Sequence, residues 1–427
     1  MKTAGSRPEA EVPRRGALRH SDFRRLWLGE SVSMLGSEMS ELAIPLLALL
    51  TLGATETQLG ILRAAQFLPF LVATLLAGVW VDRVRRCPLL VQTNLWRALL
   101  IGMIPLGAWM GWLRMPLMYV LVFAAGVGTV VFQLAFQAYV PSLVAGDDLT
   151  DANGKLSASA SAAEIGGKSV GGTLVDLVGA PAAVAVDALS YAFSASRLMR
   201  IRTEEPPPER PGAIGSLRSE IGDGVRLVFA DARIRALMAE AATFNMFNEL
   251  FLTAFLLYTA RVLGWSAFAI GLLFSAGAVG ALVGGLSANR AARRLGLGPA
   301  LVTSMAIGNS ASLVLFLIAG SGRGAQAGFV AVFAVVGSGT AMANVHTVTI
   351  RQTVVPGHLL GRMHAAYRLL SWGSIPIGAS LGGMLSAAWD PRAAMLVGAA
   401  GIPLATLWVA LSPIRRMRQV PSAPGPA

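Results

Sequence analysis

Long apolar segments recur through almost the whole chain, and they restrict its fold more than any other feature. A helix needs about 20 apolar residues to cross a bilayer, and twelve segments of the 427-residue sequence meet that length. They are 26–50, 57–80, 88–111, 116–140, 156–178, 180–200, 236–259, 267–288, 299–319, 326–350, 366–388 and 393–412. Because a bilayer offers no hydrogen-bond partners to the backbone, we expect each segment to be helical. The sequence therefore predicts an all-α polytopic membrane protein with twelve transmembrane helices.

The composition excludes several other classes of protein. Only 14% of the residues are charged and 54% are hydrophobic, whereas about a quarter of a soluble protein is charged. The single cysteine, Cys87, excludes an intramolecular disulfide. No catalytic triad, metal-ligand cluster or nucleotide-binding motif is present, so we expect neither an enzyme, a cofactor nor a metal site.

The segment between the sixth and seventh spans has a different composition. It begins with a Pro- and Glu-rich stretch at 203–212, which predicts an extended linker. Apolar residues then follow at helical spacing and predict an amphipathic helix on the membrane surface. We expect a basic N-terminal tail, a six-helix bundle, this linker, a second six-helix bundle and a C-terminal tail. Their boundaries are 1–25, 26–200, 201–233, 234–412 and 413–427.

The distribution of positive charge predicts the orientation of the chain. Of 35 Lys and Arg residues, 27 lie on the side of the two termini and four lie on the opposite side. The positive-inside rule then places both termini in the cytoplasm of a protein of the plasma membrane. The net charge of +12 is explained by this topology, and we expect no nucleic-acid partner.

An internal repeat with an offset of 211 residues divides the spans into two groups of six. Gly60 corresponds to Gly271, and Glu38 corresponds to Glu249. The other matching positions are Gly167 with Gly378 and Gly171 with Gly382. Duplicated halves are common in transporters, and small residues let membrane helices approach closely. We therefore predict that four of these glycines pack helices together, namely Gly167, Gly171, Gly378 and Gly382.

The loop between the second and third predicted spans resembles a signature of the major facilitator superfamily. The similarity is carried by Gly78, Asp82, Arg83, Arg85 and Arg86 at the family's spacing. The physical interpretation is a cytoplasmic latch, in which the carboxylate and guanidiniums pair across the two halves. The alternative is that the three arginines only anchor the topology.

Other stretches are similar to the drug-antiporter branch of that superfamily, which includes macrolide-efflux and enterobactin-export proteins. They are Phe23–Gly29, Gln352–Pro356 and Gly361–Arg362. The resemblance implies two halves that rock around a central site, a small-molecule substrate and a monomeric transporter. It also implies export and a role in drug resistance.

Acidic residues inside the spans are the strongest candidates for coupling to protons. Glu38 and Glu249 lie near the middle of spans one and seven, and Glu41 is one turn from Glu38. Such groups are costly in a membrane and commonly mark a functional site, although permanent hydration or structural pairing is the alternative. Depth along the helices predicts that Glu41 meets Arg63, either as a proton-sensitive pair or as a fixed salt bridge.

Further polar residues are candidates for structural or substrate contacts. Glu164 and Lys168 have i,i+4 spacing and predict a structural ion pair. The candidate substrate contacts are Gln133, Gln137, Asn245, Asn248 and Asn344. Each of these could instead form an interhelical hydrogen bond.

The sequence and its resemblance together predict a secondary active transporter that works by alternating access. The favoured function is proton-coupled antiport that exports a hydrophobic or amphipathic small molecule, such as a drug, natural product or siderophore. Its expected partners are the substrate, protons and the lipid bilayer. The alternatives are a proton symporter or facilitator that imports a small molecule, and a non-transporting membrane interaction or sensor protein.

Overall fold

The computed structural model describes residues 16–81, 83–144, 147–203, 205, 217–356 and 359–419. Helices and short connections account for these residues, and no strand occurs among them. The first six helices are α1 (Ser21–Leu50), α2 (Glu56–Val81), α3 (Arg86–Trp109), α4 (Met115–Leu143), α5 (Asp147–Val178) and α6 (Ala180–Leu198). They are called the N-terminal helices below, and they correspond to the first six predicted spans.

The second group begins after α7 (Leu217–Ala230). It comprises α8 (Ala232–Leu257) with the π-helical turn η2 (Tyr258–Val262), α9 (Ala267–Leu295), α10 (Leu297–Ala311) with η3 (Ser312–Leu317), α11 (Arg323–Val354), α12 (Leu360–Trp372), α13 (Ser374–Ala388) and α14 (Pro391–Ala410). Helices α8 to α14 are called the C-terminal helices. Since α12 and α13 form one span interrupted at Gly373, the group contains six spans.

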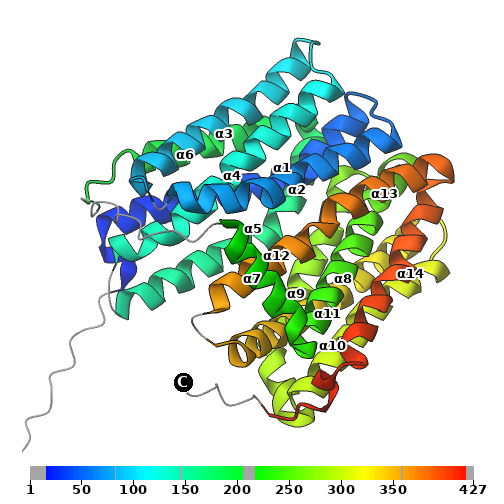
Figure 1. Cartoon of the computed structure of the whole chain (residues 1–427). Helices are drawn as coiled ribbons and strands as arrows, with labels where there is room; N and C mark the ends of the chain where they lie inside the picture. The colour runs from blue at the N-terminus through cyan, green and yellow to red at the C-terminus, as the bar shows by residue number, and fades with distance from the viewer. Residues whose placement is uncertain are drawn as a thin grey trace, which may run out of the picture.

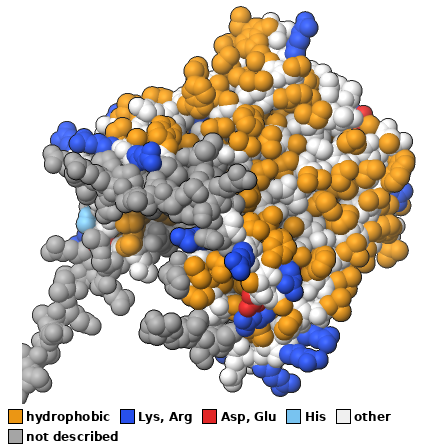
Figure 2. All heavy atoms as spheres, viewed as in Figure 1, with side chains coloured by type: hydrophobic (Ala, Val, Ile, Leu, Met, Phe, Trp, Pro, Cys, Tyr) orange, Lys and Arg blue, Asp and Glu red, His pale blue; other side chains and the backbone are white. Residues whose placement is uncertain are grey.

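The predicted all-α membrane fold with twelve spans is therefore confirmed. Seven spans in the described part of the chain are individually long and apolar enough to cross a bilayer. The others do not meet these criteria individually; α12 and α13, for example, have 13 and 15 residues. Figure 1 shows the N-terminal helices side by side and the C-terminal helices as a second group next to them. In Figure 2 hydrophobic side chains are spread widely over the described part of the visible face, as expected for a protein surrounded by lipid.

Helix α7 forms where the sequence predicts an amphipathic helix, and apolar residues in its second half pack on protein. Val228 is fully buried and belongs to a cluster that contains Met363 and Ala366 of α12. Gly224 lies against the backbone carbonyl of Arg362, so the two helices are close together. The described part of this helix therefore packs along α12.

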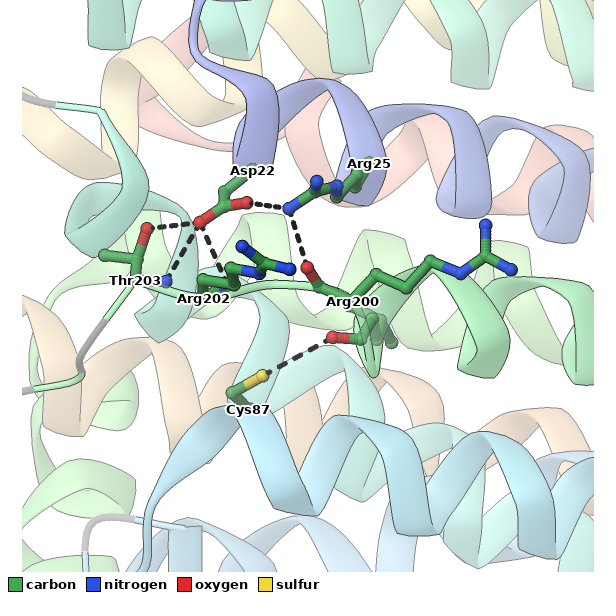
Figure 3. Close-up of polar contacts among 7 residues, drawn as sticks. Asp22, Arg25, Cys87, Arg200, Arg202 and Thr203 are labelled. Carbon is green, nitrogen blue, oxygen red and sulfur yellow. Dashed lines mark hydrogen bonds and ion pairs between the residues drawn. The ribbon is translucent and has the colours of Figure 1, made fainter.

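The start of the linker after α6 is held against the N-terminal helices. Asp22 on α1 accepts hydrogen bonds from the backbone of Arg202 and Thr203 at 3.1 and 2.9 Å, and Arg25 bridges Asp22 to the carbonyl of Arg200 (Figure 3). Further along, the carboxylate of Glu205 accepts the backbone N–H of Arg86 at the start of α3. These contacts join the beginning of the linker to α1 and α3.

Candidate functional site

The two groups of helices meet tightly at one end of the molecule, which we call the closed end. Helix α2 crosses α13, and helix α5 crosses α9. At the first crossing, a Cβ on Gly60 would lie 2.8 Å from the carbonyl oxygen of Ala379, and one on Gly383 would lie 2.6 Å from that of Glu56. Real Cβ atoms do not approach oxygen so closely, so this contact requires glycine at both positions.

The second crossing repeats the first through the internal duplication. A Cβ on Gly271 would meet the carbonyl of Lys168, and one on Gly172 would meet that of Ala267. Each of these residues lies 211 positions from its counterpart at the first crossing, the same offset as the sequence repeat. The duplication therefore builds the two contacts that seal the closed end.

Polar contacts reinforce the closed end. Arg261 pairs with Glu56 at 3.0 Å and also donates to the carbonyl of Ala54. The carboxylate of Asp176 on α5 accepts the backbone N–H groups of Ala267 and Phe268 at the start of α9, both at 2.9 Å. An anion is favourable at a helix N-terminus, so this contact holds the two groups together without a cationic side chain.

A buried ion pair crosses between the two groups just inside this end. Arg63 of α2 places Nε at 2.8 Å and a terminal nitrogen at 2.6 Å from Oε1 of Glu249 on α8. Only 4% and 6% of the two side chains are exposed. The expected ion pair between Glu41 and Arg63 is not formed, because Arg63 binds Glu249 across the interface, although Arg63 stays close enough to Glu41 to interact with it electrostatically.

Glu41 has a different partner, which also replaces the predicted pair between Glu164 and Lys168. Lys168 of α5 pairs with Glu38 and, at 3.2 Å, with Glu41, both on α1. Gly167 lies against the side chain of Glu38, so α5 is close enough for the ammonium group to reach both carboxylates. Glu164 is exposed one turn away and makes no ion pair within the described residues.

The glycines predicted to pack helices lie at helix contacts within each group. Gly167 and Gly171 of α5 lie against Glu38 and Met39 of α1. Their counterparts Gly378 and Gly382 of α13 lie against Met246 and Leu250 of α8.

A cavity of about 1010 Å³ lies mainly among the C-terminal helices. It extends from Phe251 of α8 to Arg351 and His364, near the end opposite the closed end. The aromatic side chains of Phe244, Phe274, Phe333 and Trp372 also line it. Such a mixture of apolar wall and a few polar groups is typical of a small-molecule site.

The cavity contains only some of the predicted substrate contacts. Asn245, Asn248 and Asn344 line it, although Asn245 also donates to the carbonyl of Ser371 at 2.9 Å. Glu164 and Lys168 contribute from α5. Gln133 and Gln137 are exposed on α4 and are not among its lining residues.

The predicted latch loop lies only partly within the described residues. Gly78 lies near the end of α2, while Asp82 lies outside the described residues. Arg83 and Arg85 are exposed, and Arg86 begins α3 with its backbone bound to Glu205. Within the described part of the chain, no hydrogen bond or ion pair joins these arginines to the C-terminal helices.

Sequence reasoning missed three charged residues of the cavity wall. Glu240, Arg351 and Arg368 all line it, and all three lie near the ends of predicted spans, where charges are ordinary. The signal available was helical spacing, because Glu240, Phe244 and Phe251 repeat at intervals of four and seven residues on α8 and so share one face.

Comparison with known proteins agrees with this architecture. A profile of the family described as transmembrane secretion effector matches residues 15–426. The chain belongs to this family of major facilitator transporters. It is therefore a transporter and not an enzyme, and a multi-pass protein of the inner or plasma membrane.

Individual proteins match the chain over a shorter stretch or at a low sequence identity. The enterobactin exporter EntS of Salmonella choleraesuis (strain SC-B67) is 31% identical over 169 residues, which are 39% of this chain and 40% of the exporter. A bacterial homologue of the iron transporter ferroportin in its inward-facing state is 19% identical, with a TM-score of 0.69 over 92% of this chain and 98% of that one. A structure of a bacterial ferroportin homologue in its outward-facing state is 20% identical, with a TM-score of 0.58 over 91% of this chain and 98% of that one.

Proposed function

We propose that the chain is a proton-coupled antiporter that exports a hydrophobic or amphipathic small molecule by alternating access. Its moving halves are residues 26–200 and 234–412, and both termini lie in the cytoplasm. The observation that carries the proposal is the buried ion pair between Arg63 and Glu249, which joins the two halves at the closed end. The positive-inside rule assigns that end to the outside.

The ion pair gives a physical route for coupling. When the halves separate at the outside, Glu249 loses Arg63, and an unpaired carboxylate in a low-dielectric site favours its protonated form. When the halves close again, Arg63 returns to Glu249 and favours ionisation, so the proton leaves toward the cytoplasmic side. Substrate enters the cavity in the inward-open state and leaves in the outward-open state.

Two comparisons support parts of this cycle. The chain superposes better on the inward-facing ferroportin homologue than on the outward-facing one, which agrees with a closed outer end. The partial similarity to an enterobactin exporter supports export over import.

The proposal is tested in inverted membrane vesicles that respiration has acidified. A pH-sensitive dye follows proton release while hydrophobic cations, macrolides and siderophores are added. We expect at least one compound to release protons from the wild-type vesicles, and Glu249→Gln to abolish that release.

Glu56→Gln is the matched control. It removes the ion pair with Arg261, the second one between the halves among the described residues, whose partners are each about 30% exposed, and surface pairs contribute little. Proton release that persists in Glu249→Gln would contradict the assigned coupling role. Uptake of labelled compound with no proton release would identify a facilitator.

A further inference from the structure

The charged groups in the wall of the cavity are not neutralised by one another in the way that Arg63 and Glu249 are. The cavity wall contains Arg351 and Arg368 from α11 and α12 and Glu240 from α8. Within the described part of the chain, none of these three forms an ion pair. The Nε of each arginine is buried and has no hydrogen-bond partner there.

The two guanidiniums are held by aromatic rings. Arg351 lies over Tyr367 at 4.3 Å, and Arg368 lies over Trp372 at 4.2 Å. A ring face attracts a cation, but it offers no hydrogen-bond acceptor to the N–H groups. A guanidinium has five N–H donors and prefers planar, bidentate acceptors such as carboxylates and phosphates. Stacking therefore fixes the two groups and leaves donors for a ligand.

The two arginines are positive groups of this wall with no carboxylate within ion-pair distance among the described residues. Glu240 and Arg351 are close enough to interact electrostatically, but they lie beyond ion-pair distance. Glu240 offsets one of the two guanidiniums, so one positive charge remains in this wall. On the opposite side Lys168 is already paired with Glu38 and Glu41. The exposed Glu164 also lines the cavity, from α5, and forms no ion pair among the described residues.

We infer that Arg351 and Arg368 form an anion subsite, so the transported molecule is an aromatic or otherwise apolar compound that carries an acidic group. The phenylalanines that line the cavity would contact its apolar part, while the guanidiniums bind the anion. This inference rests on the proposed function and specifies the substrate class.

The test uses two fluorescent probes that share one aromatic skeleton. The first, 8-anilinonaphthalene-1-sulfonate, carries a sulfonate, and N-phenyl-1-naphthylamine lacks it. Both are titrated into the purified full chain in phosphatidylcholine nanodiscs, with empty nanodiscs subtracted. We expect the wild type to bind the anionic probe about tenfold more tightly or better, as hydrogen bonds to charged groups allow.

The variants distinguish a specific loss of the anion subsite from a general loss of folding. Arg351→Gln and Arg368→Gln should each weaken the anionic probe about tenfold and leave the neutral probe unchanged. Arg368→Lys should restore part of the affinity, and Arg293→Gln, at an exposed position near the end of α9, should change neither probe.

Three results would overturn the anion subsite. They are equal affinity of the wild type for both probes, equal loss of both probes in the glutamine variants, and absence of saturable binding. The proton-release assay tests antiport separately from the anion subsite, because the compounds added in that assay also include hydrophobic cations.

Discussion

Charged side chains inside the N-terminal helices are held differently from those inside the C-terminal helices. Lys168 pairs with two carboxylates of α1, and Arg97 lies 3.9 Å from the centre of the Tyr191 ring while it donates to Asn94. The C-terminal helices instead leave Arg351 and Arg368 facing a cavity without an ion pair among the described residues.

This difference suggests a division of roles between the two groups. In the N-terminal helices the charges fix neighbouring helices relative to one another. In the C-terminal helices the cavity charges remain available to a ligand. The pair between Arg63 and Glu249 belongs to both groups, so it can respond to their relative movement.

The largest expected effect comes from breaking that shared pair. Glu249→Gln leaves the buried Arg63 without its partner, which costs about 3 kcal/mol or more in the closed arrangement. Spin labels on Thr51→Cys and Val262→Cys, in a Cys87→Ser background, should report a longer distance across the closed end. Adding Arg63→Gln should partly restore the short distance, and an unchanged distance in Glu249→Gln would contradict the role of the pair.

The next effect comes from the glycine crossings. Gly172→Val would place side-chain atoms against the carbonyl of Ala267, and overpacking of this kind costs about 1–3 kcal/mol. The same spin labels should then show a smaller population of the closed arrangement. Gly166→Val is the control, because a Cβ there meets nothing within 4 Å. Equal effects of the two variants would show that helix propensity, and not the crossing, is responsible.

A stability measurement sharpens the comparison between the two groups. Lys168→Gln leaves Glu38 and Glu41 close together without their cation, and because both are partly exposed we expect a loss of about 1–2 kcal/mol. Arg368→Gln removes no ion pair and should leave the unfolding temperature almost unchanged. A larger loss in Arg368→Gln would mean that its charge supports the fold.

The smallest effect concerns the start of α8, where Asp231 caps the helix. Its hydrogen bonds with the Arg233 side chain hold the pKa of Asp231 below its ordinary value of 3.8. The stabilisation is therefore complete above that value and is lost as the pH falls through the lowered pKa. Asp231→Ala should cost about 1 kcal/mol at neutral pH, and thermal unfolding should show the difference shrinking below pH 4. Asp231→Asn, which keeps a capping oxygen, should lose less.

Hydropathy predicted the spans because burial in lipid demands a minimum apolar length, but it could not locate breaks within them. The interruption at Gly373 and the π-helical turn after α8 are local departures from the regular α-helix, whereas hydropathy reports only the apolar length of a span. Helix α5 begins at Asp147, well before the predicted start of its span, because a helix can continue outside the membrane.

The sequence predicted residues of the candidate site only where the internal repeat, or a single charged residue inside a span, indicated them. Glu249 stood out as an acid inside a span, yet its partner depended on how α2 is rotated about its axis. Comparing depths placed Arg63 at the level of Glu41 and gave no information on that rotation. Arg351 and Arg368 needed the cavity itself, since aromatic stacking joins residues whose approach is set by tertiary packing.

The interruption of span eleven at Gly373 has an evolutionary consequence. Arg368 and Trp372 lie on α12 beside the cavity, while Gly378 and Gly383 lie on α13 against other helices. Mutations on one side of the break therefore change what is recognised, and mutations on the other side change how the molecule closes. Among family members that carry different compounds, selection should diversify the first pair of positions and preserve glycine at the second.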